Sequence, residues 1–93
     1  MKINFAQPFV TFDGKKLEGT ISERLGQALF NVSTLENRSL SADEKYMSYK
    51  LCQKMASNKE IEISAEEASF IKRISAEVLT AGAYGQVVDL IEK

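Results

Sequence analysis

The most informative absence in this 93-residue sequence is histidine, which does not occur at all. Histidine is the commonest general base in enzymes and the commonest zinc ligand. The single cysteine, Cys52, therefore has no imidazole to activate it and no second cysteine for a disulfide. Its place among apolar residues predicts a buried structural thiol in a reducing compartment. These absences predict a protein that is not an enzyme and needs no metal or cofactor.

Strong charge bias and long apolar runs are also lacking. Lysine and arginine total 12 and the acidic residues 13, which gives a formal net charge of −1. Neither half has the basic excess that phosphate-backbone binding requires, so a nucleic-acid partner is disfavoured. No run approaches the roughly 20 apolar residues that cross a bilayer, and the first residues do not resemble a signal peptide. The sequence predicts a soluble, cytoplasmic protein without a membrane partner, folded as one domain over residues 1–93.

Proline occurs once, at Pro8, where it interrupts an alternating apolar pattern over residues 3–12. Proline cannot donate a hydrogen bond to a strand ladder, so the pattern predicts an edge strand or two short strands. Asp13-Gly14 predicts a tight turn, after which Lys15 to Glu18 returns as the second arm. The N-terminal region is therefore expected to be a β-hairpin.

Three capping boxes predict three helices. In each box a serine or threonine is followed three positions later by a glutamate, and an amphipathic stretch comes next. The boxes begin at Thr20, Ser41 and Ser64. The apolar stripes predict helices over residues 21–32, 42–57 and 65–79. Gly82 predicts a break, after which a last stripe from Tyr84 to Ile91 is either a separate helix or a bent continuation.

Residues 60–63 alternate between glutamate and isoleucine. They predict either a short strand that pairs with the hairpin or an extended linker in which Ile63 packs ahead of the next helix. Together the patterns predict an α+β fold, mostly α, with an N-terminal β-hairpin packed on three or four amphipathic helices.

Two groups of residues that suggest chemistry have a simpler explanation. The acidic pairs Asp43-Glu44 and Glu66-Glu67 fall in the first turns of predicted helices, where capping and the helix dipole explain them. The segment from Gly82 to Gly85 is too short for a phosphate-binding loop and has no lysine. No catalytic, cofactor-binding or metal-binding residue is therefore predicted.

The candidate binding surface lies on the predicted helix 42–57. Tyr46, Lys50 and Lys54 share its polar arc, and Tyr49 lies at the border. Aromatic rings interleaved with lysines suit phosphate-bearing ligands or acidic protein patches, although such a face is also typical of a solvated helix. Phe30 lies off the apolar stripe of its own helix, so it either contacts the hairpin or belongs to a partner site.

Four segments carry a family resemblance: Phe12-Asp13-Gly14, Leu40 to Leu51, Ile61 to Lys72, and Gly85 to Glu92. In their order and rhythm, over most of the chain, they resemble small proteins encoded by tailed bacteriophages and prophages. The resemblance implies expression inside a bacterial host and a role that serves the phage. That group has no assigned activity, so it implies no site residues.

The leading functional hypothesis is a non-enzymatic accessory protein that binds a host or phage protein stoichiometrically, as an inhibitor or adaptor. One alternative is an oligomer that captures a nucleotide messenger, with Tyr46, Lys50 and Lys54 as contacts. Another is a helper of virion assembly. Because a chain this short buries a modest share of its surface, a homo-oligomer would also add stability.

Overall fold

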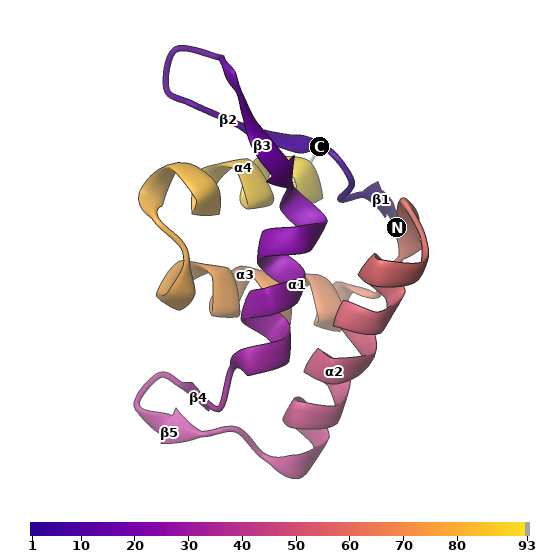
Figure 1. The fold of residues 1–93 in the computed structure, drawn as a ribbon. Helices are drawn as coiled ribbons and strands as arrows, with labels where there is room; N and C mark the ends of the chain where they lie inside the picture. The colour runs from indigo at the N-terminus through magenta and orange to yellow at the C-terminus, as the bar shows by residue number, and fades with distance from the viewer. Residues whose placement is uncertain (93) are drawn as a thin grey trace.

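The computed structural model describes residues 1–92, which form four helices and six short strands (Figure 1). The helices are α1 (Ile21–Asn31), α2 (Ala42–Ser57), α3 (Ala65–Val78) and α4 (Ala81–Glu92). The strands are β1 (Lys2–Asn4), β2 (Pro8–Val10), β3 (Lys16–Thr20), β4 (Thr34–Leu35), β5 (Arg38–Ser39) and β6 (Glu60–Glu62). The predicted α+β fold, mostly helical, is confirmed.

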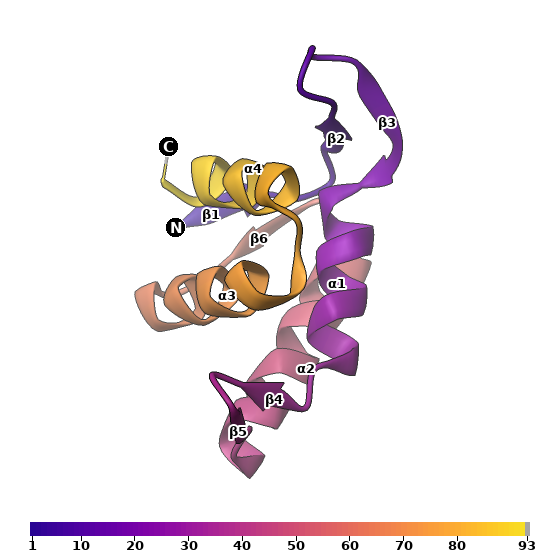
Figure 2. The ribbon, with the colours of Figure 1, turned by 90° about the vertical axis from the view of Figure 1, so that its left-hand side faces the viewer.

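The helices form two antiparallel pairs that cross each other. In Figure 1, α1 descends from the N-terminal hairpin and α2 returns beside it, while α3 and α4 run across behind them. Figure 2 shows α4 stacked on α3, with both helices on the same side of α1. The β2–β3 hairpin extends beyond the helices at one end of the molecule. The opposite face of the α1–α2 pair remains free of the second pair.

Pro8 divides the N-terminal segment into two strands with different partners. β1 pairs antiparallel with β6, with Ile3 opposite Ile61, and β2 pairs antiparallel with β3. The expected hairpin is therefore β2–β3, and the alternative of two short strands is the correct one. Each strand pair is a separate two-stranded sheet.

The hairpin is held at its turn and at the outer edge of β2. Thr11 N donates to Lys15 O at 2.8 Å, and Gly14, with a φ of 86°, donates to Thr11 O at 2.9 Å. Glycine adopts this positive φ without steric cost. On the edge of β2, Val10 N donates to Gln86 Oε1 at 2.8 Å, and Gln86 Nε2 donates to Val10 O at 3.0 Å. A side chain of α4 thus replaces the missing neighbouring strand.

Residues 60–62 form a strand, as the first of the two alternatives predicted, but its partner is β1 and not the β2–β3 hairpin. The pairing continues one position further, because Ile63 N donates to Met1 O at 2.9 Å and the Met1 ammonium donates to Ile63 O at 2.9 Å. Ile63 is also buried, at 2% exposure, immediately before the α3 cap at Ser64. This strand pair connects the N-terminus to the α2–α3 linker.

The predicted helix boundaries agree with the structure to within one residue, except around Gly82. A break does separate α3 from α4, so the last stripe belongs to a separate helix, but its predicted position is wrong because Gly82 lies inside α4. The chain bends earlier, at Leu79, whose backbone is extended. Thr80 then caps α4 by accepting from Ala83 N at 3.3 Å through its hydroxyl. This cap lacks the glutamate that marks the other helix starts.

The polar loop between α1 and α2 contains a tight hairpin that the sequence patterns did not predict. β4 pairs with β5, and the two turn residues, Glu36 and Asn37, both have positive φ values, 55° and 63°. This is the backbone of a type I′ turn, which usually contains glycine. The turn is anchored on α3, where Glu36 N donates to Glu77 Oε1 at 2.6 Å and Arg73 Nε donates to Glu36 Oε1 at 2.8 Å. Long-range contacts thus support a turn that local preference does not.

The core is one cluster to which all the helices contribute. Its fully buried apolar side chains are Phe5, Leu25, Leu29, Leu35, Leu51, Ile63, Ile71, Ile74 and Val87. Two serines, Ser48 and Ser75, lie among them. Within residues 1–92, every helix is too short or too polar to cross a membrane.

Candidate functional site

The candidate site lies on the exposed side of the α1–α2 pair, and a buried hydrogen bond sets its geometry. Ser48 Oγ, on α2, donates to Leu29 O, in the last turn of α1, at 2.6 Å. The carbonyls of a helix's last turn have no partner within the helix, so Ser48 satisfies a group that would otherwise be unpaired. The bond fixes the end of α1 against the middle of α2. The next residue, Phe30, therefore points outward beside α2.

Three exposed aromatic side chains meet at this point and form the aromatic patch, defined as Phe30, Tyr46 and Tyr49. The ring centroids of Phe30 and Tyr49 are 6.5 Å apart, and those of Tyr46 and Tyr49 are 6.3 Å apart. These separations lie within the range of favourable aromatic pairs. Phe30 is 66% exposed, Tyr46 61% and Tyr49 43%. Of the two alternatives for Phe30, contact with the hairpin is not found, because the ring lies beside Tyr49 and is largely exposed.

The two candidate lysines lie in different surroundings. Lys50 Nζ is 5.6 Å from the centroid of the Tyr46 ring, a cation–π contact that belongs to the aromatic patch. Lys54 instead turns toward α3, where its Nζ is 3.3 Å from Glu67 Oε2 and 3.4 Å from Glu62 O. The structure therefore brings together four of the five predicted residues. Lys54 stabilises the start of α3 rather than extending the patch.

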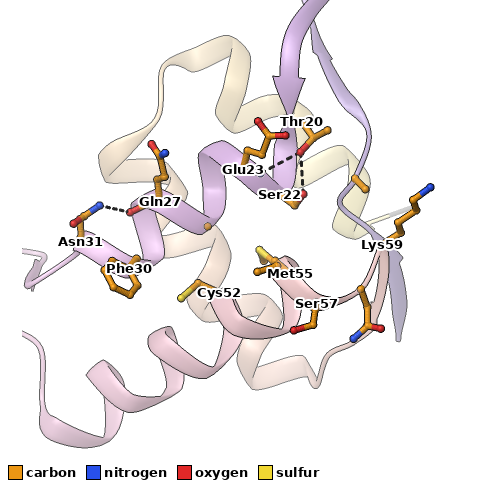
Figure 3. A pocket seen from close by; sticks show the side chains of 14 residues that line it. Thr20, Ser22, Glu23, Gln27, Phe30, Asn31, Cys52, Met55, Ser57 and Lys59 are labelled. Carbon is orange, nitrogen blue, oxygen red and sulfur yellow. Dashed lines mark hydrogen bonds between the residues drawn. The ribbon is translucent and has the colours of Figure 1, made fainter.

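A groove runs along the α1–α2 pair and ends at the aromatic patch. Its volume is about 570 Å³, and Figure 3 shows it between α1 and α2 with Phe30 at one end and Lys59 near the other. Its lining residues are Ala6, Thr20, Ser22, Glu23, Gly26, Gln27, Phe30, Asn31, Cys52, Met55, Ala56, Ser57, Asn58 and Lys59. Small or flexible apolar side chains and polar side chains both contribute to this lining. Among the lining residues, Lys59 is the one cation and Glu23 the one anion.

Gly26 leaves an unfilled space in the lining of this groove. A Cβ atom at Gly26 would meet no atom within 4 Å, so the space above it is empty. Glycine inside a helix costs about 1 kcal/mol relative to alanine. The packing of the described residues does not require this glycine, and its visible consequence is a deeper groove.

The cysteine near the site is a weak nucleophile, and two nearby glutamates serve as helix caps. Burial raises the pKa of the Cys52 thiol, whose Sγ donates to Tyr49 O at 3.0 Å. A raised pKa leaves less reactive thiolate at neutral pH. Glu44 and Glu67 complete the capping boxes at Ser41 and Ser64, as predicted. At Thr20 the box is half formed, with the hydroxyl accepting from Glu23 N.

The pKa values of these two glutamates are lowered by their partners. The Arg38 side chain and the Ser41 backbone N–H lower the pKa of Glu44 to about 2. At Glu67, burial acts to raise the pKa, but hydrogen bonds from Ser64 and Lys54 outweigh it, and the pKa lies below its ordinary value. Both carboxylates are thus held charged in structural roles, with no proton to exchange near neutral pH.

Sequence reasoning missed the groove, although a weak signal for it exists. Ser22, Gly26 and Phe30 recur every fourth residue along a row of α1 beside its apolar stripe, and all three line the groove. Small side chains at Ser22 and Gly26 leave space above the helix, and the Phe30 ring closes one end of that space. The pattern alone does not show which helix lies opposite, so the groove becomes visible only when α2 is in place.

Within residues 1–92, no three histidine, cysteine, aspartate or glutamate side chains gather in a way that could hold a metal ion. No protein-family model, no curated protein and no solved structure matches the chain. The resemblance to phage proteins thus stays a prediction.

Proposed function

We propose that this chain is a non-enzymatic accessory protein that binds one protein of a bacterial host or of a phage in fixed stoichiometry. The cytoplasm of the bacterial cell would be the place of action. The phage context rests on the sequence resemblance alone. The binding role rests on the surface of the α1–α2 pair.

The observation that carries this proposal is the aromatic patch. Its three rings are 43–66% exposed, and Tyr49 lies beside each of the other two. The ammonium group of Lys50 lies over the ring of Tyr46. Aromatic side chains near the centre of a surface are the residues that most often dominate protein–protein binding energy. Tyr49 is further oriented by Gln53, whose Nε2 donates to its hydroxyl at 2.8 Å. An ordered aromatic surface loses little side-chain entropy when a partner covers it.

The charges beside the patch indicate the character of the partner. Lys50 lies over Tyr46 and is available to an anion, whereas the nearby carboxylate Glu44 is already bound to Arg38 at 2.8 Å. A partner surface with apolar side chains and acidic groups at its edge would complement this arrangement.

The test is capture of partner protein from bacterial lysate by the immobilised chain, compared between wild type and Tyr46→Ala/Lys50→Ala. We expect the double variant to lose at least 10-fold in apparent affinity for the captured protein, since truncation of one central tyrosine costs about 2 kcal/mol. Lys72→Ala, on the α3 side, is the matched control and should bind like wild type. Equal capture by the double variant and wild type would show that the patch is not the binding surface.

A second candidate function, binding of a nucleotide messenger, is favoured by the size of the groove. A volume of about 570 Å³ lies within the range of small-molecule sites. The charge of the groove argues against it, because Lys59 is the one cation among its lining residues and Lys54 is engaged with Glu67. A thermal-shift screen with nucleotides tests this candidate, because a specific ligand raises Tm by mass action. No rise with any nucleotide at millimolar concentration would exclude it.

A further inference from the structure

The tip of the β2–β3 hairpin carries an aromatic side chain that contacts nothing. Phe12 is 104% exposed, the highest value among the large hydrophobic residues described. It belongs to the turn between β2 and β3, and this hairpin extends beyond the helices (Figures 1 and 2). Exposing a phenylalanine completely forgoes the burial that such a ring can gain.

The tip is nevertheless ordered. The Thr11 hydroxyl donates to Asp13 Oδ1 and accepts from Lys15 N at 3.1 Å, in addition to the backbone bonds of the turn. At the base of the hairpin, Phe9 is buried and Gln86 pairs with the edge of β2. An exposed aromatic side chain on a turn held by hydrogen bonds is suited to insertion into a partner, because the turn loses little conformational entropy on binding.

The same chain contains a groove of suitable size and chemistry. The space above Gly26 is open, and Cys52, Met55 and Ala56 also line the groove. The end of the groove near the start of α1 carries Glu23 and Lys59, and the turn carries Asp13 and Lys15. At the turn, Lys15 Nζ lies 3.9 Å from Asp13 Oδ2. This exposed pair contributes little to stability, so each of its charges can exchange its partner for the group of opposite sign at the groove. A net charge of −1 leaves little repulsion between copies.

We propose that the hairpin tip of one copy inserts Phe12 into the α1–α2 groove of a second copy. Every copy carries both Phe12 and the groove, so one kind of contact covers the most exposed of the large hydrophobic side chains described and fills the groove. A reciprocal exchange of hairpins closes a two-fold dimer, and a one-sided contact propagates as an open chain. This inference goes beyond the proposed function and does not depend on it, because the Tyr46 end of the patch lies outside the groove lining.

The first test is sedimentation velocity over a concentration series. Wild type should associate as concentration rises, and Phe12→Ser and Gly26→Leu should each weaken the association at least 10-fold. Gly26→Ala is the matched control for the groove, since one methyl group in open space leaves most of the volume free. Val78→Ser is the control for the tip, because it removes an exposed apolar side chain, 51% exposed, from α3.

Both controls should associate like wild type. Circular dichroism melts of all variants establish that they are folded. A monomeric wild type at every concentration overturns the proposal. Equal loss in Val78→Ser and Phe12→Ser overturns it too, since the association would then be unspecific.

The decisive test mixes the two defective variants. Phe12→Ser keeps an intact groove and Gly26→Leu keeps an intact tip, so the mixture can form one tip-in-groove contact that neither variant forms alone. A one-to-one complex in the mixture, absent from each component, supports the proposal. Failure of two folded variants to combine, while wild type associates, overturns the proposal, since the association then uses surfaces other than the tip and the groove.

Discussion

At the scale of single residues, the core contains two buried serines in opposite situations. Ser48 Oγ donates to a carbonyl of α1 at 2.6 Å, whereas Ser75 Oγ, fully buried in α3, has no partner among the described residues. A buried hydroxyl with a partner adds stability, and one without a partner costs its desolvation. The same residue type therefore contributes with opposite sign at the two positions.

Replacing each serine by alanine should show this difference. We expect Ser48→Ala to lower the free energy of unfolding by about 1–2 kcal/mol, because it leaves Leu29 O buried and unpaired. Ser75→Ala should raise the free energy of unfolding by up to about 1 kcal/mol, because it removes an unsatisfied group without opening a large cavity. Urea unfolding midpoints at equal m-value measure both changes. A loss of stability in Ser75→Ala similar to that in Ser48→Ala would mean that Ser75 has a partner after all.

At the scale of elements, the capping residues at the helix N-termini specify where three of the helices begin. The cap at Ser41 is strengthened from outside the helix, because Arg38 binds Glu44 through both of its terminal nitrogens, at 2.8 and 2.9 Å. This pair joins the β4–β5 hairpin to the first turn of α2. The cap therefore links two elements as well as starting one.

Acid should weaken this cap over a defined pH range. Arg38 and the Ser41 N–H hold the pKa of Glu44 at about 2, against an ordinary value of 4.5. Its contribution to stability is complete above about pH 4.5 and is lost as the pH falls through about 2, since the folded state then has to bind a proton it resists. The stability difference between wild type and Glu44→Gln, measured by thermal melts from pH 7 to pH 2, should shrink over that interval.

Arg38→Gln is the partner variant for this experiment. It should reduce the same pH-dependent difference, because Arg38 is the largest cause of the lowered pKa. If the difference in stability between wild type and Glu44→Gln stayed constant at all pH values, Glu44 would not have the lowered pKa that the Arg38 contact implies.

The elements also show how far the sequence predicts this fold. Capping boxes and apolar stripes predicted three of the helices to within one residue, because those signals are local. The start of α4 was misplaced, since Thr80 caps it without a glutamate and Gly82 is tolerated inside the helix. The β4–β5 turn was missed because Glu36 is held at positive φ by contacts from α3. Local signals thus fail where distant residues determine the backbone.

At the scale of the whole molecule, the candidate site was predictable in its parts but not in its arrangement. Exposure of Tyr46 and Tyr49 follows from their places on the α2 helical wheel. The approach of Phe30 to Tyr49 does not, because it depends on how the end of α1 lies against α2. The groove depends on the same packing. The direction of Lys54 toward Glu67 likewise depends on where α3 begins.

The β2–β3 hairpin extends beyond the helices (Figure 1), and Gln86 is its main polar anchor. Gln86 forms two hydrogen bonds with Val10 and a third with Gly82 O at 3.0 Å within its own helix. Gln86→Ala should leave Val10 N without a partner and loosen β2 from α4, while the buried contacts between α1 and α2 stay intact. Local opening of a weakly packed unit costs less free energy than global unfolding.

We therefore expect Gln86→Ala to speed hydrogen exchange in the hairpin at least 10-fold, with little change in α1 and α2 and a global loss of about 1–3 kcal/mol. Gln53→Ala, which removes a glutamine from the exposed side of α2, is the matched control and should leave hairpin exchange unchanged. A loosened hairpin also presents Phe12 less rigidly, so the same variant should weaken self-association while its groove remains intact. If hydrogen exchange at the Val10 amide did not change, burial of Phe9 alone would hold the hairpin in place. Self-association through Phe12 would then not depend on Gln86.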